Sequence, residues 1–230
     1  MNPCASSPPT EIERVAWEGY LEPLGQTFRS ASLPRVTLGE PEGWPAAEAM
    51  ESRLGQKWTP PAAGRRYTLV RLACTLHPPS DKSVTYSEAT LTAYLRPRAG
   101  AGRVVAHDLY PQRQTVESKG KLALALKPNL KFAAVAEAGL EAGVEIEHHD
   151  AFPVITGFGL GESNPYWQFA RHAASPLIGC QSVYVVLDTP LDADGVRLSL
   201  ELIASLETRY GPLRAGLPEA ARAHLSRAMA

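Results

Sequence analysis

The feature that most constrains this chain is an alternation of apolar with polar or smaller residues, at a period of two, that recurs from Arg66 to Ile203. Successive side chains of a β strand point to opposite faces, so this period indicates strands with one buried face. Short strands at regular spacing, without long helical patterns between them, predict an all-β protein folded as an antiparallel β sandwich. The candidate strands cover residues 66–76, 84–95, 103–109, 121–127, 144–148, 152–156, 166–170, 181–187 and 196–203.

The chain divides into two parts of different composition. Residues 1–65 are rich in proline, which interrupts helices and central strands, so we expect an irregular N-terminal arm with one short helix at 45–51. Residues 66–230 form the expected β-sandwich domain. Good helix formers behind a proline predict a short closing helix at 218–228. Residues 130–142 fit either a helix or a strand.

Charge and cysteine content narrow the possible partners and the compartment. The formal net charge is −1 and no block of either sign occurs, so no nucleic-acid partner is expected. The three cysteines (Cys4, Cys74 and Cys180) show no CxxC spacing, which argues against a disulfide framework and a four-ligand zinc site. No secretory signal and no run of 18 apolar residues is present, which predicts a cytosolic location. We expect no cofactor.

One cluster of acidic and histidine side chains could bind a metal ion. On a strand, Glu145, Glu147 and His149 would project from one face, and two carboxylates with an imidazole suit a divalent cation. His107 is the candidate fourth ligand, and this set would define a metal-dependent hydrolase. The competing interpretation is a solvated strand face. His107 and Asp108 are adjacent, so on a regular strand they would point to opposite faces and could not act on one substrate.

Two other motifs favour structural roles. Residues 157–161 have the spacing GxGxG, which differs from that of phosphate-binding loops and is typical of a bulge or of tight backbone packing. Cys180 stands beside apolar residues, which favours a buried, unreactive thiol over a nucleophile.

Exposed aromatic and arginine side chains are typical anchors of protein interfaces. The arm holds Trp17, Trp44 and Trp58, and a polar turn is followed by Tyr166, Trp167 and Arg171. Core packing is the alternative for the second group, because Trp167 shares a strand face with Phe169. These residues favour a non-enzymatic binding or assembly module, which acts on a protein partner or within a homo-oligomer.

Residues 121–147 allow a different function. They are rich in small residues, and their alternation could form a long amphipathic hairpin that inserts into a membrane as part of an oligomeric β protein. The charges of Lys127, Lys131, Glu137 and Glu141, which are scattered along the segment, argue against this function. A soluble antiparallel sheet shows the same alternation, so the pattern alone does not decide between them.

Overall fold

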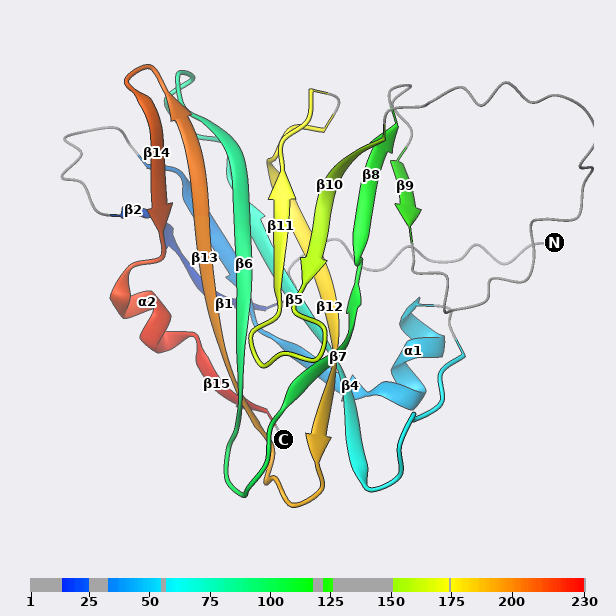
Figure 1. Cartoon of the computed structure of the whole chain (residues 1–230). Helices are drawn as coiled ribbons and strands as arrows, with labels where there is room; N and C mark the ends of the chain where they lie inside the picture. The colour runs from blue at the N-terminus through cyan, green and yellow to red at the C-terminus, as the bar shows by residue number, and fades with distance from the viewer. Residues whose placement is uncertain are drawn as a thin grey trace, which may run out of the picture.

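The computed structural model describes residues 14–24, 33–54, 57–117, 122–125, 151–173 and 175–229. Within these residues the chain forms two antiparallel sheets and two short helices (Figure 1). The prediction of an all-β sandwich is therefore confirmed. No helix in this part of the chain is long and apolar enough to cross a membrane.

The smaller sheet, sheet A, has six strands in the described residues, in the order β1-β3-β5-β12-β7, with β4 paired to β5 beside β3. Its longest ladder joins β5 to β12. The strands are β1 (Val15–Tyr20), β3 (Arg35–Gly39), β4 (Glu42–Pro45), β5 (Arg65–Leu76), β7 (Val105–Tyr110) and β12 (Gly179–Pro190).

The larger sheet, sheet B, has nine strands in the described residues, in the order β2-β14-β13-β6-β11-β10-β8-β9, with β15 paired to β13. Its longest ladder joins β6 to β13. The strands are β2 (Glu22–Pro23), β6 (Thr85–Pro97), β8 (Arg113–Glu117), β9 (Leu122–Ala125), β10 (Ala151–Phe158), β11 (Tyr166–Ala170), β13 (Val196–Thr208), β14 (Gly211–Gly216) and β15 (Ser226–Met229).

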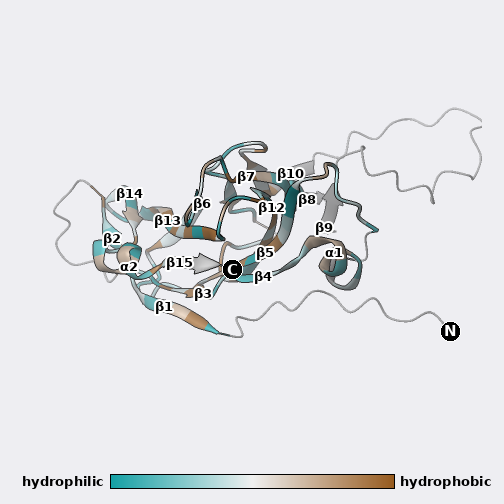
Figure 2. Cartoon of the chain, turned by 90° about the horizontal axis from the view of Figure 1, so that it is seen from below, coloured by the Kyte–Doolittle hydropathy of each residue, from teal (hydrophilic) through white to brown (hydrophobic). Residues whose placement is uncertain are grey.

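The main core fills the space between the two sheets. Alternate residues of both sheets point into it, as the period of two requires, and strips of contrasting hydropathy along the strands reflect this (Figure 2). Trp167 and Phe169 on β11 are fully buried there. Cys74 is buried in the same core, and burial raises the pKa of its thiol to about 12.

A second, smaller core covers the outer face of sheet A. Helix α1 (Ala46–Leu54) buries Ala46, Ala49 and Met50, whose spacing places them on one side of the helix. They share this core with residues of β5, β7 and β12: Tyr67, Leu69, Tyr110, Tyr184 and Val186. Helix α2 (Glu219–His224) lies at the other side of the molecule, near β2 (Figure 2).

The described residues between 14 and 65 are more regular than an irregular arm. They include α1, where the helix at 45–51 was expected, and also β1, β3 and β4, which all join sheet A. Proline still limits them: Pro34 and Pro41 stand just outside β3, and Pro45 ends β4. Because these strands are short and bounded by proline, their alternation is too brief to stand out in the sequence.

Candidate functional site

The three tryptophans of the first 65 residues pack against their own chain. Trp17 is half-buried against the main core, and its indole lies over Gly19, whose substituted Cβ would approach the ring to 2.6 Å. Trp44 and Trp58 are half-buried against the second core. The described part of the N-terminal region is therefore held by side-chain burial within the same molecule.

Trp58, Tyr67 and His107 form an aromatic cluster on the outer face of sheet A. The ring of Tyr67 lies 5.2 Å from that of Trp58 and 5.3 Å from that of His107, and both contacts are edge-to-face. The third pair, Trp58 and His107, is 6.3 Å apart. Rings packed this closely contact one another and leave no space for a ligand between them.

A β-bulge corrects the expectation that His107 and Asp108 point to opposite faces. In the ladder between β7 and β12, Asp108 pairs with Val186 but Leu187 pairs with Ala106, so His107 is the extra residue. Ala106 and Leu109 point into the main core. His107 and Asp108 both lie on the outer face of sheet A, because they contact Tyr67 and Tyr110 of the second core.

The Asp108 carboxylate organises the turn from β7 to β8. It accepts hydrogen bonds from the Leu109 backbone N–H at 2.9 Å, the Tyr110 hydroxyl at 2.5 Å and the Gln112 amide at 2.7 Å. Burial, together with this bond to Asp108, raises the pKa of the Tyr110 phenol. Three donors commit both carboxylate oxygens to the turn, which gives Asp108 a structural role.

The structure describes one of the four predicted metal ligands. His107 packs in the aromatic cluster, while Glu145, Glu147 and His149 lie outside the described residues. Among the residues that the structure describes, no group of three His, Cys, Asp or Glu side chains could hold a metal ion.

The second group of predicted interface residues separates into core and surface. Trp167 is fully buried between the sheets, which corrects its assignment as an interface anchor. Its side chain and that of Phe169 both point into the main core, as expected if this face of the strand serves core packing. Tyr166 lies on the outer face of sheet B, where its ring stacks on Phe158 with centroids 4.9 Å apart. Arg171 is exposed and forms an ion pair with Glu207 at 3.2 Å.

A polar chain that the sequence did not suggest links β1, β3 and the end of β5. The Thr37 hydroxyl donates to Glu18 Oε2 at 3.2 Å and lies 2.7 Å from His77 Nε2, and Arg35 forms an ion pair with Glu18 at 2.9 Å. These polar contacts therefore hold β1 against β3 of sheet A.

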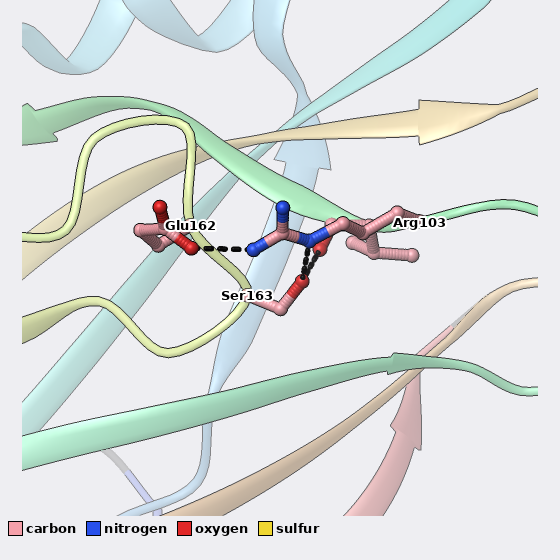
Figure 3. Close-up of polar contacts among 4 residues, drawn as sticks. Arg103, Glu162 and Ser163 are labelled. Carbon is pink, nitrogen blue, oxygen red and sulfur yellow. Dashed lines mark hydrogen bonds and ion pairs between the residues drawn. The ribbon is translucent and has the colours of Figure 1, made fainter.

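The loop between β10 and β11 is anchored to both sheets. Its backbone carbonyls at Ser163 and Pro165 accept bonds from β6, and Glu162 accepts one from Ala106 on β7. Arg103 adds side-chain contacts to this loop, an ion pair with Glu162 and a hydrogen bond to Ser163 Oγ at 3.0 Å (Figure 3). These bonds tie the loop to β6 of sheet B and to β7 of sheet A.

Comparison with known proteins identifies no family. No protein-family model matches the sequence, and no curated protein matches it. Solved structures are similar to the chain only distantly, among them the three that follow. The membrane-inserted form of the NetB toxin of Clostridium perfringens is 9% identical, with a TM-score of 0.35, over 93% of this chain and 99% of that one.

Two further structures show similarly low sequence identities and TM-scores. The delta-toxin of Clostridium perfringens is 8% identical, with a TM-score of 0.31, over 87% of this chain and 96% of that one. The C-terminal domain of the Streptococcus pyogenes antigen I/II-family protein AspA is 10% identical, with a TM-score of 0.29, over 80% of this chain and 53% of that one. Scores this low give no basis for transferring a function.

Proposed function

We propose that this protein is a non-enzymatic assembly module that self-associates and inserts one β hairpin per copy into a membrane. The observation that supports the proposal is the register between β8 and β10. Glu117 pairs with Ala151, Val116 with Phe152 and Thr115 with Pro153, so the two strands run antiparallel up to the residues that flank positions 118–150. The segment between them, which includes β9, therefore begins and ends on neighbouring strands of sheet B.

The sequence of this segment matches a continuation of the same ladder. Residues 118–121 and 126–150 lie outside the described residues, so only their sequence bears on this point. If each further step advanced one residue on both strands, three lysines would each face a glutamate. The pairs are Lys121 with Glu147, Lys127 with Glu141, and Lys131 with Glu137. Opposite charges directly across an antiparallel ladder stabilise that register.

The same register separates the segment into an apolar and a polar face. Every even-numbered position from 122 to 132 and from 136 to 146 carries an apolar residue. Between 122 and 146 all the charged residues lie at odd-numbered positions, together with alanine, glycine, one asparagine and Val135 at the tip, so alanine occurs on both faces. Lipid-facing strands require this alternation of apolar and polar sides. Because Pro128 has no backbone N–H, one hydrogen bond of the extended ladder would not form at that position.

The length of the segment is sufficient to cross a bilayer. With residues 133–135 as the tip, residues 118–132 and 136–150 would supply 15 residues on each side, whereas a tilted transmembrane strand needs about 9–11 residues. In the described structure Leu122–Ala125 instead form β9, which pairs with β8. Extension of the hairpin would therefore require β9 to leave β8, which makes insertion a conformational change coupled to assembly.

The experiment uses charge reversal to test the register. Release of a dye from liposomes is measured for the wild type, for Lys127→Glu, and for Lys127→Glu combined with Glu141→Lys. We expect the single variant to lose release, because the introduced carboxylate would face that of Glu141, and the double variant to recover it. The matched control combines Lys127→Glu with Glu137→Lys, which has the same composition but places like charges opposite each other at two positions.

The outcomes separate the proposal from its alternatives. Recovery in both double variants would contradict the register, and an absence of release by the wild type from any vesicle would contradict membrane insertion. Circular dichroism and thermal melting of each variant check that the soluble fold is kept. Light scattering of the wild type, in solution and after extraction from liposomes, measures self-association. The expected cytosolic location stays a prediction.

A further inference from the structure

Three arginines gather on the outer face of sheet B, at the end where β6 stops and β13 starts. Arg96 and Arg197 are directly opposite each other in the ladder between β6 and β13, and both are exposed. Arg98 is two residues beyond Arg96, and its backbone N–H donates to the Gly195 carbonyl at 3.1 Å, which holds it beside the start of β13. This end is opposite to the one at which β8 ends (Figure 1).

The arginine cluster lies beside the turn that carries Asp192 and Asp194, where the Asp194 backbone N–H donates to the Ala99 carbonyl at 3.1 Å. None of the three arginines takes part in the ion pairs found among the described residues. Glu201, further along β13, is already engaged by the Tyr94 hydroxyl at 2.7 Å and by Arg222 at 3.5 Å. Like charges directly opposite in an antiparallel pair destabilise the sheet, so an anion that bridges Arg96 and Arg197 would relieve a repulsion that the fold contains.

We infer that Arg96, Arg98 and Arg197 form a binding site for a phosphate group. The guanidinium group is planar and presents paired N–H donors that match the oxygens of phosphate. Two such groups on adjacent strands, with a third on the same face, supply donors from different directions to one tetrahedral anion. The phosphate can belong to a small soluble ligand or to a lipid headgroup, and the chemistry of recognition is the same.

The test uses inorganic phosphate and three variants of the full chain. Thermal melting is measured in chloride and in phosphate at equal ionic strength. We expect phosphate to raise the melting temperature of the wild type but not of Arg96→Gln or Arg197→Gln. In chloride each of these variants should melt at or above the wild-type temperature, because a repulsion has been removed. The control is Arg214→Gln, an exposed arginine of the same sheet that lies opposite Ser205.

Calorimetric titration measures the affinity of the wild type and of each variant for inorganic phosphate. Loss of one charge-assisted pair of hydrogen bonds should weaken binding by about tenfold or more. An equal loss in Arg214→Gln, or no phosphate-dependent stabilisation of the wild type, would overturn the site.

Vesicles distinguish the source of the phosphate. If the wild type sediments with phosphatidic acid vesicles and Arg96→Gln does not, the ligand is a lipid headgroup. If inorganic phosphate binds but neither protein sediments, the ligand is soluble. The site does not involve residues 118–150, so phosphate binding can succeed or fail independently of membrane insertion.

Discussion

Gly157 and Trp167 are cross-strand partners in the ladder between β10 and β11, and the backbone of the glycine lies directly against the edge of the indole. A Cβ atom at position 157 would be 3.2 Å from Trp167 Nε1 and 3.1 Å from the Pro111 carbonyl oxygen. Trp167 is fully buried, so it has little room to move away. Gly157 therefore serves close backbone packing, as the spacing of residues 157–161 suggested, whereas Gly161 has open space around it and a positive φ of 75°.

Replacement of Gly157 should destabilise the sandwich. The two methyl groups of Gly157→Val would press on the indole and on the Pro111 carbonyl, and overpacking of this kind costs about 1–3 kcal/mol. Urea unfolding followed by tryptophan fluorescence measures the change. Thr156→Ala, on the opposite face of the same strand, is the matched control and should stay within about 0.5 kcal/mol of the wild type. Equal stability of Gly157→Val and the wild type would show that the indole can shift.

The two described cysteines should differ strongly in reactivity. Burial raises the pKa of Cys74 to about 12, so only about one thiol in 10⁴ would be ionised at pH 8, and the thiolate is the reactive form. Cys180 is half-buried, which corrects the expectation of a buried thiol there. In a Cys4→Ser variant, a thiol reagent at pH 8 should label Cys180 first and Cys74 only upon unfolding. Rapid labelling of both, detected by peptide mass spectrometry, would contradict the buried position of Cys74.

Stability should decrease as the pH becomes alkaline. Burial raises the pKa values of Cys74, Tyr86 and Tyr110 above their unfolded values. A group whose pKa is raised in the folded state contributes stability that is complete below its unfolded pKa and is lost as the pH rises toward its folded pKa. The loss should begin above about pH 8.5 for the thiol and above about pH 10 for the phenols.

Tyr110→Phe tests the contribution of one phenol. This variant cannot ionise at position 110, so its stability should fall less steeply between pH 10 and pH 12 than that of the wild type. Denaturant unfolding at a series of pH values measures both slopes. Parallel curves would show that the Tyr110 phenol keeps an ordinary pKa in the folded protein.

The sequence predicts long strands better than it predicts their irregularities. The alternation along 84–95, 166–170 and 196–203 identifies β6, β11 and β13, because each of these strands has one buried face. The bulge at His107 has no such signal: a single extra residue in a ladder depends on the partner strand and leaves the composition unchanged. For this reason the faces of His107 and Asp108 were predicted wrongly.

The polar clusters illustrate a second limit. Glu18, Thr37 and His77 come from positions 19 and 40 residues apart, and only the pairing of β1, β3 and β5 brings them together. No local spacing marks such a group. The arginine cluster is partly visible in the sequence as Arg96 and Arg98, but the register of β13 is needed to add Arg197.

The last prediction concerns the tryptophans of the N-terminal region. Trp58 packs against Tyr67, and Trp17 packs against the main core, so both stabilise their own chain. Truncation of a fully buried tryptophan to alanine costs about 3–5 kcal/mol. Because Trp17 and Trp58 are half-buried, Trp17→Ala and Trp58→Ala should each lower the free energy of unfolding by roughly half of that, while Trp58→Phe should retain most of the edge-to-face contact. Thermal melts measure the loss, and light scattering measures the mass. A change in mass without a change in melting temperature would instead place these side chains at a contact between copies.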